Sequence, residues 1–149
     1  MSKHEELAAW LRLTLIPGIG GESQRKLLAA FGLPEAIFTA GRLEVRSVIG
    51  DKADLLFDSA PAEAIEHSLA WASQPGQSIL TLADNAYPQS LLEIADPPNV
   101  LYVRGNAALL QTRGLAMVGS RNATPQGLQT AENFAKTLAG RGLCIISGL

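Results

Sequence analysis

Two short apolar runs on either side of a helix-like segment constrain the carboxyl-terminal part of this chain most strongly. Residues 115–118 and 143–146 are apolar and closed by glycine or serine, as strands covered on both faces of a sheet should be. Between them, Thr124 is a good residue to begin a helix and Gly142 a good residue to follow one. The pattern from 114 to 148 therefore predicts a strand, a helix and a second strand parallel to the first.

This β-α-β unit is predicted to be the front half of a Rossmann-type parallel sheet. The helix carries one apolar stripe that can cover a sheet face: Leu128, Ala131, Phe134, Ala135 and Leu138. A parallel sheet with one complete crossover is not a finished domain, so we expect the chain to be a fragment or to be completed by something else. Because an unpaired sheet edge is a liability, we expect this chain to associate through that edge or to be less stable than a longer parent.

The loop between the first strand and the helix is predicted to hold a phosphate. A loop after a parallel strand lies at the carboxyl edge of the sheet, where such folds bind ligands. The helix directs its unpaired first-turn amides and the positive end of its dipole into the same space. Arginine offers a bidentate fork for phosphate oxygens, serine a hydroxyl donor and glycine close approach to the backbone; the alternative is a tight turn with an exposed arginine. The candidate phosphate-binding residues here are Gly119, Ser120, Arg121, Asn122, Thr124 and Gly127, the last of which is expected to allow close packing against the strand.

A second loop, at Ser147 and Gly148, follows the second strand and is predicted to add further phosphate donors. The Gly-x-Gly-x-x-Gly fingerprint is missing, which disfavours NAD and FAD, and no Gly-Lys-Ser/Thr follows the glycines as in a Walker loop. His4 and His67 have no neighbouring ligand set, and Ser120 has no identifiable histidine base. We expect no cofactor, no metal and no catalytic residue.

Earlier in the chain the pattern is helical. Helices are expected over 5–15, from about 22 to 31, and over 34–40, 43–49, 53–57 and 61–72. Residues 73–78 have linker chemistry, and strands are expected at 79–82 and 101–103. The predicted fold class is α/β, with a helical domain over 1–72, a linker over 73–78 and an incomplete Rossmann-like domain over 79–149.

A glycine-rich turn separates the first two predicted helices. Ile16-Pro17-Gly18-Ile19-Gly20 looks like the hairpin of a helix-hairpin-helix motif, in which backbone amides contact DNA phosphates. Arg25 and Lys26 are the nearby basic residues. The turn is therefore either a DNA contact or a purely structural hairpin.

The charge balance restricts where a polyanion could bind. The formal net charge is −2, and residues 1–78 carry seven Lys and Arg against ten Asp and Glu. Residues 79–149 carry five against four, so a polyanion site would be local rather than a basic face. The single cysteine, Cys144, excludes an internal disulfide, and no apolar run approaches the ~18 residues of a membrane span. We expect a cytoplasmic protein.

Isolated aromatic and acidic residues allow two readings each. Tyr87 and Tyr102 could stack on bases, or they are part-buried packing residues. Asp84, Glu93 and Asp96 lie in predicted loops, where solvated or capping roles are expected rather than acid-base chemistry.

The order of residues from 79 to 149 resembles the DNA-processing protein A family (DprA, also called Smf). The anchors before the phosphate loop are Tyr87-Pro88, Leu91-Leu92, Asp96-Pro97-Pro98, Val100-Leu101-Tyr102 and Arg104-Gly105. Those that follow are Met117-Val118-Gly119-Ser120-Arg121, Thr124, Gly127, Ala131, Leu138-Ala139, Gly142 and Ile145-Ile146-Ser147-Gly148. The helical segment is similar to the SAM-like or helix-hairpin-helix-like domain that many members carry.

The resemblance implies a single-stranded-DNA-binding recombination mediator without enzymatic activity. Such proteins act in natural transformation (competence), where they protect incoming strands and help to load the RecA recombinase. The family's Gly-Ser-Arg loop falls on Gly119, Ser120 and Arg121, and its Ser-Gly loop on Ser147 and Gly148. In the family, a further basic DNA contact and the surface for a homodimer come later than position 149. Gln126 departs from the family pattern, in which an aromatic residue is common before the glycine.

An enzyme is the alternative. Nucleoside-monophosphate phosphoribohydrolases of the "lonely guy" type also arrange glycines and an arginine around a nucleotide phosphate. Their Pro-Gly-Gly-x-Gly-Thr motif does not occur in these 149 residues, and the Tyr-Pro and Asp-Pro-Pro segments are foreign to them. The third hypothesis is a helical interaction module joined to a truncated remnant that binds nothing.

Overall fold

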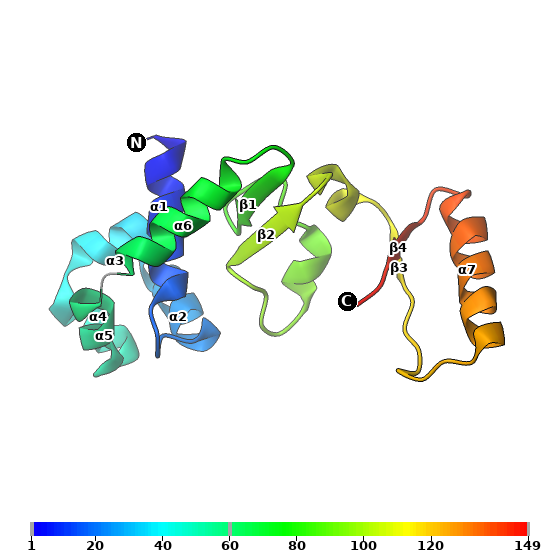
Figure 1. Cartoon of the computed structure of the whole chain (residues 1–149). Coiled ribbons are helices and arrows are strands. Elements are labelled where there is room, and N and C mark those ends of the chain that lie inside the picture. Colours follow the sequence, from blue (N-terminus) through cyan, green and yellow to red (C-terminus); the bar gives the residue numbers. More distant parts are fainter. Residues whose placement is uncertain (1, 60, 149) are drawn as a thin grey trace. The chain divides into compact units, whose positions relative to one another are not determined.

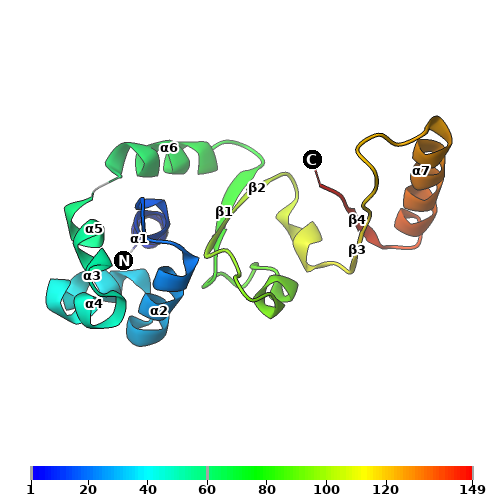
Figure 2. The same ribbon diagram turned by 90° about the horizontal axis from the view of Figure 1, so that it is seen from below.

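A computed structural model describes residues 2–59 and 61–148, which form two compact units, Met1–Ala107 and Ala108–Leu149. The first unit (Figures 1 and 2) is helical and ends in a strand pair. Its elements are α1 (Lys3–Leu15), α2 (Gly21–Phe31), α3 (Pro34–Ala40), α4 (Arg42–Ile49), α5 (Lys52–Asp58), α6 (Ala62–Ala72), β1 (Gln77–Thr81), the 3-10 helix η1 (Gln89–Glu93) and β2 (Val100–Arg104). The 3-10 helix η2 (Ala107–Gln111) leads into the second unit, which contains β3 (Gly114–Ala116), α7 (Pro125–Ala139) and β4 (Cys144–Ile146).

The predicted helices of the first unit are confirmed to within about two residues at most ends. The start of α1 is the clearest difference, because the helix begins at Lys3 rather than at residue 5. Ser2 Oγ accepts a hydrogen bond from the Glu5 amide at 3.3 Å, and Glu5 Oε2 accepts one from the Ser2 amide at 2.7 Å. This reciprocal capping box satisfies two amides at the helix start. The backbone hydrogen bond from Ser2 also lowers the pKa of the Glu5 carboxyl.

One continuous apolar core holds α1 to α5 together. Eight buried residues form it, each at most 3% exposed: Leu13, Ile16, Ile19, Leu27, Ile37, Val45, Ala53 and Leu56. They come from five helices and from the turn between α1 and α2, so the core joins segments that are far apart in sequence. Burial of this apolar surface is the main stabilising contribution in the first unit.

The turn between α1 and α2 depends on Gly18. Its φ is +86°, in a region that side-chain-bearing residues rarely adopt. A Cβ at this position would also lie 2.8 Å from Leu55 Cδ1 on α5. The positive φ therefore favours glycine here, and a larger residue would also have to displace the end of the Leu55 side chain.

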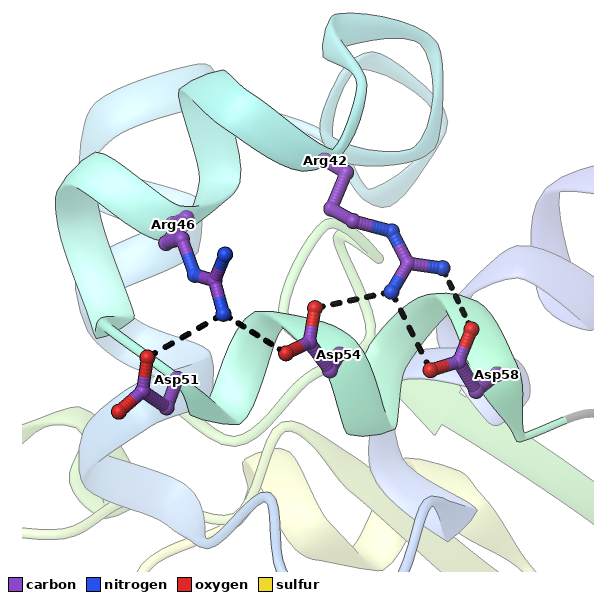
Figure 3. Close-up of polar contacts among 5 residues, drawn as sticks. All are labelled: Arg42, Arg46, Asp51, Asp54 and Asp58. Atoms are coloured by element: carbon purple, nitrogen blue, oxygen red, sulfur yellow. Dashed lines mark hydrogen bonds and ion pairs between the residues drawn. The ribbon is translucent and has the colours of Figure 1, made fainter.

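An ion-pair network joins α4 to α5 on the surface of the first unit (Figure 3). Arg42 pairs with Asp54 at 2.8 Å and also with Asp58, which lies one turn further along. Arg46 pairs with the other oxygen of Asp54 at 2.8 Å and with Asp51 at 3.2 Å. The hydrogen bond from Arg42 lowers the pKa of the Asp58 carboxyl. Because all five side chains are well exposed, the network aligns two helices without a large gain in stability.

The first strand pair differs from the prediction of a parallel sheet over 79–149. β1 and β2 pair antiparallel, with Ile79 opposite Tyr102, and they form a two-stranded sheet of their own. The connection between them contains η1 but no α-helix, whereas parallel neighbours need a long crossover that is usually helical. β1 also contacts α6, and β2 contacts α1. This strand pair therefore packs with the helices in the first unit.

The predicted β-α-β unit is present in the second unit, where β3 and β4 are parallel. Leu115 lies opposite Ile145, and the ladder is extended by hydrogen bonds from the Met117 amide to the Ile146 carbonyl at 2.8 Å and from the Cys144 amide to the Arg113 carbonyl at 2.9 Å. The helix begins where Thr124 predicts, but its C-cap is Gly140. Gly142 has the positive φ of +84° that is common just after a helix. It lies two residues after the C-cap, whereas one residue was predicted.

Burial is where the second unit departs most from the sequence prediction. Both strands were expected to be covered on both faces, yet no described residue from 108 to 148 is fully buried. Leu115 is 40% and Ile146 is 57% exposed, and Leu128 and Phe134 of the helix stripe are 61% and 60% exposed. The reason is that the described part of this unit has one helix to cover two strands. Because both layers are so small, apolar side chains stay exposed on the helix and on the strands.

The units divide the chain at a different place from the expected linker. Residues 73–78 join α6 to β1, and β1 already begins at Gln77. A domain boundary at 73–78 stays a prediction, as does the assignment of residues 1–72 to a SAM-like domain and of residues 79–149 to a Rossmann-like one.

Candidate nucleic-acid interface

The two strand-end loops of the second unit lie on one open groove of about 1060 Å³. The predicted site residues that line it are Gly119, Ser120, Arg121, Asn122, Thr124, Gly127, Ser147 and Gly148. They come together because β3 and β4 are parallel neighbours, so that both loops leave the same edge of the sheet. The amino-terminal end of α7 lies on the same groove through Thr124 and Gly127.

The Gly-Ser-Arg loop presents donors to solvent. Ser120 Oγ accepts a hydrogen bond from the Asn122 amide at 3.2 Å, which folds the loop into a short turn and leaves the hydroxyl hydrogen free to donate. Arg121 is exposed, and no carboxylate within 2–59 or 61–148 forms an ion pair with it. A Cβ at Gly119 would meet nothing within 4 Å, so a ligand has room to approach the backbone there.

The start of α7 offers fewer free amides than the sequence prediction assumed. Thr124 Oγ1 accepts the Gly127 amide at 3.1 Å, and the Thr124 carbonyl accepts the Leu128 amide at 3.0 Å. Pro125 has no amide hydrogen. In the described chain, the amide of Gln126 is therefore the one donor among the first three helical residues without a hydrogen bond. The helix contributes one amide and its dipole, and Arg121 and Ser120 supply the remaining donors of this loop.

Gly127 has a different local role from the one expected. It was predicted to allow close packing of the helix on the strand. A Cβ there would instead lie 3.2 Å from Thr124 Oγ1, the oxygen that caps the helix. The glycine therefore leaves room for the cap.

Part of the groove lining is apolar, although none of these apolar residues was among the predicted site residues. They include Val118, Leu128 and Ala131, and Val118 is 93% exposed. Glu132 also lines the groove, and its carboxylate pairs with Lys136 at 2.6 Å, which offsets the negative charge near a prospective phosphate. The apolar stripe of α7 and the position before Gly119 are the sequence signals for this surface.

The two tyrosines differ in burial. Tyr87 is 1% exposed and its hydroxyl donates to the Pro98 carbonyl at 2.7 Å, so it is a core residue; burial raises its pKa. Tyr102 is 49% exposed and lies edge-on to Trp71, with ring centroids 5.3 Å apart.

Asp84 is a capping residue, since its Oδ2 accepts hydrogen bonds from the Thr81 amide at 2.7 Å and the Thr81 hydroxyl at 2.9 Å.

The described residues contain neither a cluster of metal ligands nor a helix that could span a membrane. Residues 2–59 and 61–148 contain no group of three or more His, Cys, Asp or Glu side chains that could hold a metal ion. No helix in these ranges is long and apolar enough to cross a membrane.

The residues that line this groove lie in a segment that matches a known protein family. Residues 78–149 match the family described as DNA recombination-mediator protein A. That match begins in β1 and includes both strand-end loops of the groove. The matched segment therefore contains the whole β-α-β unit.

Individual relatives extend the likeness to the helices. The chain is 32% identical to Protein Smf of Escherichia coli over 146 residues, which is 94% of this chain and 37% of that protein. It is 35% identical to the DNA processing protein DprA of Streptococcus pneumoniae over 111 residues (68% of this chain, 38% of that protein), and 35% identical to that of Bacillus subtilis over 82 residues (54% and 28%). The chain spans less than two fifths of the length of each. From the ordered anchors, the β-α-β unit and these matches, we conclude that the chain belongs to the DprA/Smf family of DNA recombination-mediator proteins.

Proposed function

We propose that this chain carries part of the single-stranded-DNA site of a recombination mediator that acts in natural transformation. In this proposal the groove of the second unit binds the phosphate backbone, with Arg121 as the charged contact and Ser120, the Gln126 amide and the loop of Ser147 and Gly148 as further donors. The protein has no enzymatic activity of its own and works in the cytoplasm.

One observation carries the proposal: an exposed arginine without an acidic partner in the described chain lies on a groove formed by two strand-end loops and a helix start. The positive end of the α7 dipole and the arginine fork both favour an anion. No arrangement for reading base edges is needed, because binding without sequence preference uses phosphate contacts and stacking. The apolar lining at Val118 and Leu128 gives a base or sugar a surface to rest on.

The proposal is tested by oligothymidine binding to Arg121→Ala. Loss of one phosphate contact is expected to weaken binding about five- to tenfold at low salt and to flatten the log-log salt dependence by about 0.7. Arg141→Ala is the matched control, because it removes the same charge from the same unit outside the groove. Fluorescence anisotropy with labelled oligothymidine measures both.

Two outcomes would contradict the proposal. Equal affinities and salt slopes for the Arg121 and Arg141 variants would remove the arginine from the site. Hydrolysis of AMP by the unaltered chain would favour the phosphoribohydrolase alternative, and strand binding without hydrolysis supports the mediator.

Further parts of the proposal concern structure and partners. We propose that the second unit is the beginning of a Rossmann-like domain and that the helices are a SAM-like domain. The functional partners are single-stranded DNA and the RecA recombinase, and the longer protein is a homodimer. Co-sedimentation of RecA with DNA-bound protein tests the partnership, and an unchanged rate of RecA filament formation in its presence would contradict it.

A further inference from the structure

Tyr102 on β2 is the exposed aromatic side chain of the first unit. It is 49% exposed, whereas every other aromatic residue in the described part of this unit is buried or half-buried. Phe31, Phe38 and Phe57 pack against the apolar core of the helices. Tyr102 lies outside that core, so part of its ring is accessible to a ligand.

Two side chains of α6 hold the Tyr102 ring in one orientation. The ring of Trp71 lies 5.3 Å from it between centroids, at an interplanar angle of 62°. The hydroxyls of Tyr102 and Ser68 are 2.8 Å apart. Because the Ser68 hydroxyl donates to the Ala64 carbonyl at 2.8 Å, the Tyr102 hydroxyl is the donor in this pair. A ring that is already fixed loses little conformational freedom when a ligand binds to it.

A positive charge lies on the same face of the strand as this ring. Side chains alternate between the two faces of a strand, so Tyr102 and Arg104 extend from the same face of β2, roughly 7 Å apart along the strand. Arg104 is exposed, and no carboxylate within 2–59 or 61–148 forms an ion pair with it. The strand therefore presents an aromatic ring and an available guanidinium side by side.

The acidic residues of α6 lie away from this ring. Ser68 and Trp71 are three positions apart and therefore lie on one face of α6, the face that contacts Tyr102. Glu63 and Glu66 precede Ser68 by five and two positions, which places them on the other side of the helix. Neither carboxylate is on the face that contacts Tyr102, so the helix does not oppose the approach of an anion there.

We propose that Tyr102, Trp71 and Arg104 form a stacking patch, a second contact for single-stranded DNA that belongs to the first unit. A base stacks on the exposed part of the Tyr102 ring, and Arg104 contacts a neighbouring phosphate. The nature of the ligand rests on the proposed function, but the patch supplies a different interaction from the groove, because binding of single strands combines stacking with phosphate contacts. The bases of a duplex are already paired and stacked, so this contact favours single strands over duplex DNA.

Oligothymidine binding to variants of the full chain separates the two parts of the stacking patch. Tyr102→Leu is expected to weaken binding about five- to tenfold with an unchanged log-log salt slope, because stacking releases no counterions. Tyr102→Phe keeps the ring and is expected to stay within about twofold of the unaltered chain. Arg104→Ala is expected to flatten the salt slope by about 0.7. Phe134→Leu is the matched control, since Phe134 is 60% exposed and does not line the groove.

Photo-cross-linking of the unaltered chain to an oligonucleotide that carries iododeoxyuridine tests the stacking patch without a substitution, so it serves even if Tyr102→Leu loses its helical circular dichroism. Cross-links mapped by mass spectrometry are expected at Tyr102 or Trp71, and a duplex of the same sequence is expected to give none there.

The outcomes distinguish the stacking patch from the groove. Weaker binding by Arg121→Ala, together with equal affinities for Tyr102→Leu and Phe134→Leu, would overturn the stacking patch and leave the groove in place. Weaker binding by Tyr102→Leu, with Arg121→Ala equal to Arg141→Ala, would support the stacking patch and count against the groove. Cross-links confined to residues 108–149 would also overturn the stacking patch.

Discussion

The two units divide stability and binding chemistry between them. The first unit contains every fully buried apolar side chain of the described residues, and several of its charged side chains pair with one another, at α4 and α5 and between Arg25 and Asp96. The second unit has no fully buried residue in its described part, and it presents an arginine that is not ion-paired there. Surface charges that pair with one another are not available to a ligand, whereas Arg121 on the open strand-end groove has no such ion pair in the described chain.

This contrast also explains why the net charge of the whole chain does not indicate whether a small anion site is present. The first unit contains most of the acidic residues, and several of them are used to hold its own arginines. The phosphate site that we propose in the second unit uses only Arg121 and a few backbone or hydroxyl donors. A site of this size is invisible in a net charge of −2.

The largest expected effect compares a leucine from each unit. Leu27→Ala is expected to cost about 2–5 kcal/mol of unfolding free energy, because Leu27 is fully buried, whereas Leu128→Ala on the exposed stripe of α7 is expected to stay within about 0.5 kcal/mol. Denaturant unfolding followed by circular dichroism measures both. Trp10 and Trp71 both lie in the first unit, so their fluorescence reports that unit separately. Similar losses for the two variants would break the comparison.

A smaller difference is expected between two glycines. Gly18→Ala forces an alanine to a φ of +86° and brings its Cβ to 2.8 Å from Leu55, so we expect a loss of about 1–3 kcal/mol. Gly119→Ala is the matched change in the second unit, where the added Cβ meets nothing within 4 Å, and little change in stability is expected. Thermal melts of the two variants decide the point. A stable Gly18→Ala protein would mean that the turn can relax without glycine.

The smallest effect concerns the exposed network of α4 and α5. Because Arg42 lowers the folded-state pKa of Asp58, the ionised carboxylate stabilises the folded state above the ordinary aspartate pKa, and this contribution is lost as the pH falls through the lowered value. Asp58→Asn should therefore melt slightly below the unaltered protein near neutral pH, and the gap should close as the pH falls through the lowered pKa of Asp58. Glu63→Gln on α6 is the control. A gap that persists in acid would assign the loss to something other than this charge.

Local patterns in the sequence predicted the elements well. Helix ends followed from residues such as Gly32 and Thr124, and the parallel pairing of β3 and β4 followed from two apolar runs around one helix. The Ser2–Glu5 capping box was overlooked although its spacing is visible in the sequence. These features are local, so a few neighbouring residues determine them.

Long-range contacts could not be predicted in the same way. Gln24 and Asn99 are 75 residues apart, and nothing near either one indicates that their side chains pair. The pairing of β1 with β2 likewise joins residues that are about 20 positions apart, such as Ile79 and Tyr102. In the groove, the residues that meet were predicted. The loss of free amides at α7 was not, although it follows from the neighbouring residues Thr124 and Pro125 and is therefore a local feature.

The most direct test of the central claim is an amide chemical-shift map of the isotope-labelled chain titrated with oligothymidine. A phosphate site in this groove predicts shifts at Gly119 to Thr124, at Gln126 and at Ser147 and Gly148, with the α1–α2 turn unchanged. Shifts confined to the first unit, or spread evenly over both units, would contradict a phosphate site in the groove of the second unit.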